Sequence, residues 1–392
     1  MKNYKIFASV VDKETQKQVK ELSESEAYKD CTIRVMPDAH RGSGCTIGSV
    51  IAIGDRVVPQ TIGVDISCGM FVLCLGNVEI DLEKLDAVIN EHIPSGFNIH
   101  ETAVMDAKEL LEKLHCKDAI DIDYVERSIG TLGGGNHFIE VDQDEDGNKF
   151  LVIHSGSRKL GKLVCEYWQK KAVEYCEKKA YNEREIIDRL KAEGREREIF
   201  KALADAKANA PKVNKELAYL EGDDKKQYID DMLICQRYAD LNRQHMAYTI
   251  CKEMELSAVD KFTTLHNYID MWHNIIRKGA VSALHGERLI IPINMRDGSL
   301  FCVGKGNIDW LYSAPHGAGR IMSRAEAEKK LNVEDFKKSM DGVFSTSVCE
   351  ETIDEAPMVY KDIDTIIKDI EPTVEVKKIW KPIYNFKAKS KE

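Results

Sequence analysis

The order of apolar and polar residues along this chain alternates between the pattern of strands and the pattern of helices. Early in the chain, short runs rich in valine and isoleucine lie between polar, glycine-rich segments. Such runs predict buried strands, which we place over residues 32–37, 48–58 and 62–75, with a turn at 38–44. Residues 81–92 and 103–114 instead have apolar positions at the spacing of one helix face.

A β-hairpin is predicted over residues 136–154. Two apolar strands, 136–141 and 150–154, flank an acidic segment that contains Asp146-Gly147-Asn148. Glycine beside aspartate or asparagine tolerates the positive φ angles of a tight turn. Opposed residues of an antiparallel pair have Cβ atoms about 5 Å apart, so the hairpin brings His137 opposite or nearly opposite His154.

A long helical insertion is predicted from residue 162 to about residue 254. This segment is rich in lysine and glutamate and has a 3.6-residue period, with a looser stretch at 193–211. Its apolar stripes are Val164, Trp168, Ala172, Cys176 and Ala180, followed by Ile234, Tyr238, Leu241 and Tyr248. Strands then return at 262–268, 289–293 and 299–303, and helices are expected after Gly319 and over 333–340. We therefore expect an α+β protein, with residues 1–392 forming a single domain whose β-rich core carries this insertion.

Composition limits the class of protein. The chain has 392 residues, of which 43% are hydrophobic and 31% charged, so an ordinary folded core is expected. There is no apolar run of membrane-spanning length and no secretory signal, and the 11 cysteines include no Cys-x-x-Cys pair. We expect a cytoplasmic protein with free thiols and no membrane association. A net charge of −10 argues against coating nucleic acid by overall charge, although it permits a local basic groove or bound metal ions.

Five side chains are candidate metal ligands. Asp65 and Cys68 lie three residues apart between glycines, and they combine a hard oxygen with a soft sulfur, which suits a transition metal. His137, His154 and His266 lie beside asparagine, serine and glycine at or near strand ends. Taken singly, a strand cysteine or histidine is more often a buried core residue. Five protein ligands together are too many for one closed tetrahedral site, and they fit two metals with a bridging thiolate and open positions.

His316 has a different setting. Proline precedes it and Gly317, Ala318 and Gly319 follow, so a large ligand could approach the backbone. A helix starting near Gly319 would add an anion-binding N-terminus. The residues alone leave three roles open for His316, namely metal ligand, general base and nucleophile towards phosphorus.

Five segments in order resemble the RtcB family, RNA-splicing ligases that join RNA ends with GTP and Mn²⁺. The most specific segments are GVDISCGM at 63–70, GGGNHFIE at 133–140, HSGSR at 154–158, HN at 266–267 and HGAGR at 316–320. The resemblance extends from about residue 36 to residue 388.

The resemblance implies a role for each matching position. Asp65, Cys68, His137, His154 and His266 match the ligands of two Mn²⁺ ions, with Cys68 bridging. His316 matches the catalytic histidine that takes GMP from GTP as a covalent intermediate. The guanylate-contacting positions correspond to Asn136, His137, Phe138, Ile139, Glu140, His266, Asn267, Pro292, Ile293, Asn294, Met295, Ser299, His316, Gly317, Ala318, Gly319, Tyr360 and Lys387.

The implied reaction joins an RNA 3′-phosphate, or a 2′,3′-cyclic phosphate opened first, to a 5′-hydroxyl end in RNA repair or tRNA splicing. The implied partners are broken RNA and GTP, the need for an archaease-like activator stays open, and we expect a monomer. One segment departs from the family. Where many members have Pro-Gly-Ser-Met-Gly, this chain has PINMRDG at 292–298, and it is also shorter than many members, which suggests a divergent branch devoted to repair.

Two other functions compete with RNA ligation. A dinuclear metal-dependent phosphoesterase would use the same five ligands and would have no use for His316 as a nucleophile. A catalytically silent RNA-binding protein would have no use for the full ligand set, and the acidic net charge argues against it.

Overall fold

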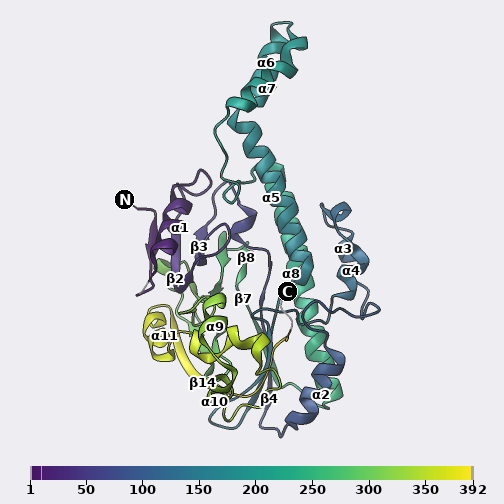
Figure 1. Cartoon of the computed structure of the whole chain (residues 1–392), viewed down its shortest axis with the longest axis vertical. Coiled ribbons are helices and arrows are strands. Elements are labelled where there is room, and N and C mark those ends of the chain that lie inside the picture. The colour runs from purple at the N-terminus through teal and green to yellow at the C-terminus, as the bar shows by residue number, and fades with distance from the viewer. Residues whose placement is uncertain (1, 10, 390–392) are drawn as a thin grey trace.

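A computed structural model describes residues 2–9 and 11–389 of the chain. Figure 1 shows a β-rich body from which a long pair of helices projects. These helices belong to the predicted insertion, and the mixture of sheets and helices confirms the α+β class.

The central element is a seven-stranded antiparallel sheet with the order β11-β12-β14-β5-β6-β4-β7. Its strands, in chain order, are β4 (Gly69–Gly76), β5 (Phe138–Gln143), β6 (Lys149–Ser155), β7 (Asp260–Leu265), β11 (Arg288–Asn294), β12 (Gly298–Gly304) and β14 (Val374–Phe386). The two edge strands approach each other, because Arg288 of β11 forms an ion pair with Asp260 of β7. The sheet therefore curls towards closure, which leaves little open edge.

Two smaller sheets complete the β structure. A five-stranded sheet has the order β1-β2-β3-β9-β8, and a two-stranded sheet pairs β10 with β13. Their strands are β1 (Tyr4–Ile6), β2 (Ile33–His40), β3 (Ile47–Ala52), β8 (Asn267–Asp270), β9 (Ile275–Lys278), β10 (Ala280–Ser282) and β13 (Ser313–Pro315).

Helices cover these sheets and form the projecting arm. The helices of the body are α1 (Lys13–Glu24), α2 (Leu82–His92), α3 (Lys108–Leu111), α4 (Ile122–Arg127), α9 (Arg324–Lys330), α10 (Val333–Ser339) and α11 (Ile363–Ile370). The arm consists of α5 (Arg158–Ala180), α6 (Glu183–Ala192), α7 (Ile199–Asn209) and α8 (Gly222–Glu253). In Figure 1, α6 and α7 lie at the far end of the arm, and α8 runs from the arm into the body.

The two faces of the seven-stranded sheet carry different cores. Inside the curl, Trp380 stacks between Phe150 and Phe301, with ring centroids 3.8 and 5.0 Å away. On the other face, Ile139 and Ile153 pack in a cluster with residues of α2 and α8. Alternate residues of β5 therefore point to opposite faces, as the two-residue period of a strand requires.

Three predicted strands are wrong in their bounds. The strand expected over 48–58 is β3, which ends at Ala52. Strand β2 does not end at Pro37 but continues to His40, because the β2–β3 register shifts between Val35 and His40. A bulge of this kind tolerates a residue that cannot donate a ladder hydrogen bond. Asp65 and Cys68 do not lie in a strand either. They lie in a turn before β4, which Ser67 closes with a φ of 59°.

Several predicted helical features also differ. The predicted helix at 103–114 is reduced to α3, with the carboxylate of Glu126 accepting a hydrogen bond from the Ala107 amide at 2.8 Å. The looser stretch at 193–211 contains α7, and Tyr248 is 65% exposed instead of buried in a stripe. The helix expected after Gly319 is present and begins at Arg324, after the capping residue Ser323. An anion-binding role for its N-terminus stays a prediction.

The predicted hairpin is confirmed. Strands β5 and β6 pair in the register that places Phe138 opposite His154, so His137 is nearly opposite His154. No helix among the residues described combines the length and apolarity needed to cross a bilayer. The division into one domain stays a prediction.

Candidate metal centre and nucleotide cleft

The candidate metal ligands come from one end of four neighbouring strand segments. Strand β4 lies between β6 and β7, and Gly69 at its start is opposite both Ser155 and Leu265. The residues next to these three positions are Cys68, His154 and His266. His137 directly precedes β5, which pairs with β6. Sheet register thus brings together side chains that are far apart along the chain.

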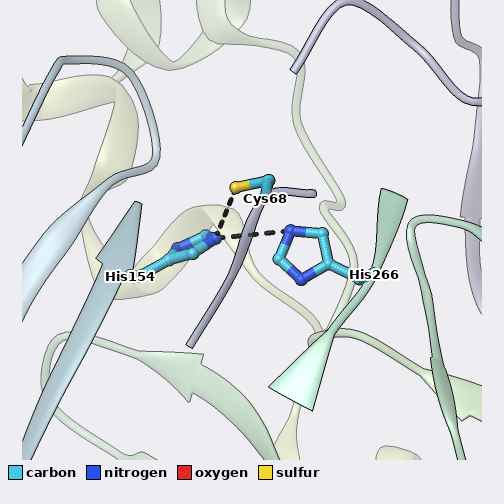
Figure 2. Close-up of side chains that lie close together, drawn as sticks. All are labelled: Cys68, His154 and His266. Carbon is cyan, nitrogen blue, oxygen red and sulfur yellow. Dashed lines mark hydrogen bonds between the residues drawn. The ribbon is translucent and has the colours of Figure 1, made fainter. Parts of the chain in front are cut away.

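The five side chains form two groups of three that share Cys68. The first group is Asp65, Cys68 and His137, and the second is Cys68, His154 and His266, with the ligand atoms of each group within 4.8 Å of one another. In the first group, Asp65 Oδ2 lies 2.9 Å from His137 Nε2, which is 3.4 Å from Cys68 Sγ. Figure 2 shows the second group, where His154 Nε2 lies 3.2 Å from Cys68 Sγ and 3.4 Å from His266 Nε2.

Backbone carbonyls orient two of the imidazoles. His137 Nδ1 lies 2.8 Å from the Leu132 carbonyl, and His154 Nδ1 lies 3.2 Å from the Asn136 carbonyl. A carbonyl can only accept, so each Nδ1 carries the proton and each Nε2 is left with its lone pair. This arrangement is typical of histidines that bind a metal. The Nδ1 of His266 is buried without a hydrogen-bond partner.

The surroundings favour the neutral forms of His154 and His266. Burial, followed by neighbouring imidazoles, lowers the pKa of His154 and His266 well below the ordinary histidine value. Burial opposes ionisation of Asp65, but the adjacent His137 imidazole leaves the pKa of this carboxyl below its usual value. Burial and the nearby Asp65 carboxylate raise the pKa of Cys68. A bound cation reverses that last effect, because a coordinated thiol loses its proton.

The absence of a side chain at Gly156 leaves room for the Asp65 carboxylate in the site. A Cβ atom added at Gly156 would lie 2.0 Å from Asp65 Oδ1, so the Asp65 carboxylate would have to move from its position. The glycine after β6 is therefore required for Asp65 to reach the other ligands. The donor set of one carboxylate, one thiol and three imidazoles fits transition metals in two adjacent sites.

His316 lies beside the second group of ligands. Its ring centroid is 4.9 Å from that of His266. Its Nδ1 donates to Asp38 Oδ2 at 2.6 Å, and Asp38 is fully buried on β2. The carboxylate fixes the ring and the tautomer, which leaves Nε2 with the lone pair. Gly319, with a φ of 75°, lets this loop pass close to Asp38, because a Cβ there would lie 2.9 Å from the Asp38 Cα.

A cleft of about 800 Å³ contains His316 and most of the predicted guanylate-contacting residues. The predicted residues that line it are Asn136, Phe138, Glu140, Pro292, Ile293, Asn294, Met295, His316, Gly317, Ala318, Gly319, Tyr360 and Lys387. His154 lines it as well, so the cleft reaches the second group of metal ligands. A cavity of this volume is of the size that binds a nucleotide.

Five predicted contact residues do not line the cleft, and two of them, His137 and His266, belong to the groups of candidate metal ligands. Ile139 points into the opposite core with α2 and α8. Ser299 is fully buried on β12, opposite Pro292. The side chain of Asn267 holds other backbone groups, since it donates to the Asp65 carbonyl at 3.1 Å and accepts from the Gly279 amide at 2.9 Å.

A buried carboxylate organises one wall of the cleft. Glu355 accepts from Lys387 at 3.0 Å, from the Tyr360 hydroxyl at 2.7 Å and from Arg320 at 3.2 Å. Burial opposes ionisation of Glu355, but Lys387 and Arg324 outweigh it and hold the pKa at about 2. The pKa of Glu140 is shifted in the opposite direction. Its burial and the adjacent Asp142 raise its pKa well above the ordinary value, while Asn385 donates to it at 2.6 Å.

The divergent segment 292–298 is a turn held by side chains. Asn294 Oδ1 accepts from the amides of Arg296 and Asp297 at 3.0 and 2.9 Å. The Asn294 amide donates to Asp297 at 2.8 Å, and Arg296 pairs with the same carboxylate. The Asn294 side chain thus stabilises a turn that does not need the backbone freedom of the glycines this segment lacks.

Sequence reasoning missed Asp38 and Glu355. Asp38 falls in the turn predicted at 38–44, and Glu355 has no predicted role. A signal was available for Asp38, because a carboxylate directly after an apolar run and a proline is in position to face a site. For Glu355, the sequence offers no comparable signal.

Comparisons with known proteins agree with the site. A family model described as tRNA-splicing ligase RtcB matches residues 18–123 and 118–388. RNA-splicing ligase RtcB1 of Escherichia coli is 31% identical over 389 residues, which cover 88% of this chain and 87% of that protein. RNA-splicing ligase RtcB of Escherichia coli strain K12 is 30% identical, with the same coverage. tRNA-splicing ligase RtcB of Nanoarchaeum equitans is 26% identical over 426 residues, covering 85% of this chain and 83% of that protein. On the strength of these matches, the chain belongs to the RtcB family of RNA- and tRNA-splicing ligases.

Proposed function

We propose that this protein is a GTP- and Mn²⁺-dependent RNA ligase acting through a covalent His316–GMP intermediate. It joins a 3′-phosphate, or a 2′,3′-cyclic phosphate after opening, to a 5′-hydroxyl in RNA repair or tRNA splicing. The observation that carries the proposal is the position of His316, in a nucleotide-sized cleft and 4.9 Å between ring centroids from a candidate metal ligand.

Asp65, Cys68 and His137 would hold one Mn²⁺ ion, and Cys68, His154 and His266 would hold the second. When bound, the ions supply positive charge that stabilises the phosphate oxygens during displacement. Cys68 lies in both groups, so its thiolate would be available to both ions.

His316 acts as the nucleophile towards GTP. Its Nε2 forms a bond to the α-phosphorus while the α–β phosphoanhydride bond breaks and pyrophosphate leaves. Asp38 keeps the Nδ1 proton in place and stabilises the positive charge that develops on the ring. An oxygen of the RNA 3′-phosphate then attacks the same phosphorus, and the bond from nitrogen to phosphorus breaks.

The final step joins the two RNA ends. The 5′-hydroxyl oxygen attacks the activated 3′-phosphate, its proton passes to solvent, and GMP leaves. The wall that binds the guanylate is the cleft surface formed by Phe138, Glu140 and Lys387, with Tyr360 held by Glu355. In this proposal the protein is a cytoplasmic monomer that needs no membrane.

Labelled GTP distinguishes the ligase from the phosphoesterase. The protein is incubated with α-labelled GTP and Mn²⁺, denatured and tested for bound label. A ligase retains label, and the His316→Ala variant retains none although it still binds Mn²⁺. A protein that retains no label but hydrolyses phosphate esters would be the alternative, a dinuclear metal-dependent phosphoesterase that uses the same candidate ligands.

Joining of RNA tests the complete reaction. RNA fragments with 3′-phosphate and 5′-hydroxyl ends are supplied with Mn²⁺, and GTP is added or withheld. We expect the joined product only with GTP. A product that forms equally well without any nucleotide would contradict the role given to His316.

A further inference from the structure

Two neighbouring polar residues of α8, Asn242 and Arg243, are fully buried beneath the candidate metal centre. They are unusual in position, because α8 belongs to the helical insertion and not to the sheet that carries the ligands. Buried amide and guanidinium groups are costly unless they are hydrogen-bonded. What they bond to therefore indicates why they are there.

Arg243 joins the two segments that carry Cys68 and His154. Its Nη1 donates to the Ser67 carbonyl and to the Ser155 carbonyl, both at 2.8 Å. Ser67 directly precedes Cys68, and Ser155 directly follows His154. A single guanidinium nitrogen thus fixes the distance between two segments whose ligand atoms are 3.2 Å apart.

Asn242 hydrogen-bonds to two segments, one that leads to His137 and one that contacts Asp65. Its Oδ1 accepts from the amides of Gly130 and Thr131 at 2.8 and 3.0 Å. Its Nδ2 donates to the Gly156 carbonyl at 3.2 Å, and Gly156 is the residue against which Asp65 packs.

A chain of hydrogen bonds connects Asn242 to His137. Asn242 Nδ2 also donates to Ser155 Oγ at 3.1 Å, and Ser155 Oγ donates to the Leu132 carbonyl at 2.8 Å. That carbonyl is the one that orients His137 through Nδ1. Asn242 therefore acts on the first group of ligands and Arg243 on the group that contains His154.

We propose that Asn242 and Arg243 are positioning residues that hold the metal-binding segments at the separation two ions require, so that the helical insertion is a structural part of the metal centre. The inference rests on the proposed metal-binding function of the five ligands. It goes beyond that function, because neither residue is itself a ligand.

Binding of Mn²⁺, measured by titration calorimetry on the full chain without RNA or GTP, tests the proposal. The informative variants are Asn242→Asp, which replaces the donor amide by an acceptor of the same shape, and Arg243→Met. Loss of a group that orients metal ligands costs about 10- to 100-fold in metal affinity. We expect each variant to raise the Kd of at least one ion by that factor, and Arg243→Lys to recover part of the loss.

Tyr238→Phe is the matched control. Tyr238 is also fully buried on α8, and its hydroxyl donates to the Val125 carbonyl at 2.7 Å, away from the ligands. Thermal melts show whether each variant is folded and how far it is destabilised. We expect the control to lose stability while its Mn²⁺ affinity stays within about twofold of the wild type.

Each outcome bears on the proposal. Variants that bind two ions as tightly as Tyr238→Phe does would overturn it and leave the metal function standing. A wild-type protein that binds no Mn²⁺ would overturn both. If Arg243→Met does not fold, Asn242→Asp and Arg243→Lys decide the result by the same criterion.

Discussion

At the scale of single residues, the Nδ1 partners of His137 and His154 differ from that of His316. Two candidate ligands, His137 and His154, have backbone carbonyls as partners, whereas His316 has the carboxylate of Asp38. A carbonyl fixes the ring without adding charge, and a carboxylate also stabilises the ring when it becomes positive. This difference is consistent with the proposed roles, ligand for His137 and His154 and nucleophile for His316.

Asp38→Asn tests the role given to the carboxylate. The variant keeps the shape of the side chain but loses the charge and no longer fixes the tautomer of His316. We expect transfer of GMP to the protein to slow by about 100-fold or more, as for a catalytic histidine deprived of its carboxylate. Measurement of bound label against time checks this, and unchanged Mn²⁺ affinity is the control. A variant that is guanylylated at the wild-type rate would contradict the assignment.

The buried pair Glu140 and Asp142 predicts a pH effect on stability. Burial is the main cause that raises the pKa of both carboxyls, and for Glu140 the Asp142 charge adds to it. The folded protein therefore binds more protons than the unfolded chain above pH 4, so this pair makes stability fall as the pH rises towards neutral. Each unit of raised pKa corresponds to about 1.4 kcal/mol.

Asp142→Asn removes one member of that pair. We expect the variant to gain stability relative to the wild type between pH 5 and pH 8, with the larger gain at pH 8, where the wild-type pair carries more charge. Thermal melts across this range check the sign. Glu145→Gln, in the exposed turn, is the surface control. A stability difference that shrinks with rising pH would contradict the prediction.

At the scale of elements, the register of the paired strands determines which side chains come together at the site. The hairpin at His137 and His154 could be predicted, because its turn residues and its two-residue alternation lie within one short segment. The turn at Asp65 and Cys68 was taken for a strand, since the apolar run continues through it and the φ of 59° at Ser67 has no signal in a serine. Pairing of β4 with β7 joins residues nearly two hundred positions apart, and only the resemblance to a family connected them.

For the same reason, only some of the predicted guanylate-contacting residues line the cleft. Phe138 and Glu140 line the cleft, but Ile139 between them faces the opposite core. A family motif identifies a stretch of residues, whereas the strand decides which of its side chains reach the ligand. For Asp38, the available signal was a carboxylate after an apolar run and a proline, whereas the bulge that continues β2 through Pro37 cannot be recognised from local pattern.

The end of the helical arm should be dispensable for the metal centre. Helices α6 and α7 lie far along the arm in Figure 1, and in these two helices only Leu190 is buried. Asn242 and Arg243 lie instead on the part of α8 inside the body. Replacing residues 183–210 with a short Gly-Ser linker should leave Mn²⁺ affinity within about twofold. Calorimetry checks this, and a loss of tenfold or more would show that the end of the arm supports the centre.

At the scale of the whole molecule, an acidic chain places three cationic side chains around one buried carboxylate in the wall of the cleft. The net charge is −10, yet Arg320, Arg324 and Lys387 gather around Glu355 beside His316. With the added charge of metal ions, such a cleft binds phosphate without an overall basic surface. The acidic composition is thus compatible with an RNA substrate.

Metal binding should stabilise the fold as a whole, because its ligands come from four separate segments. An ion that binds only the folded state adds RT ln(1 + [L]/Kd), or about 2.7 kcal/mol at a hundredfold excess over Kd. We expect Mn²⁺ to raise the melting temperature and a chelator to reverse the effect. The Cys68→Ala variant, which lacks the shared ligand, should respond much less. An equal rise in both proteins would indicate binding elsewhere.

The most direct test of the central claim is anomalous diffraction at the manganese edge from crystals grown with Mn²⁺. The account predicts two peaks about 3.5–4 Å apart. One should lie among Asp65, Cys68 and His137 and the other among Cys68, His154 and His266, with His316 facing them across the cleft. A single peak, a peak that does not contact Cys68, or an ion bound by His316 in place of these ligands would contradict it.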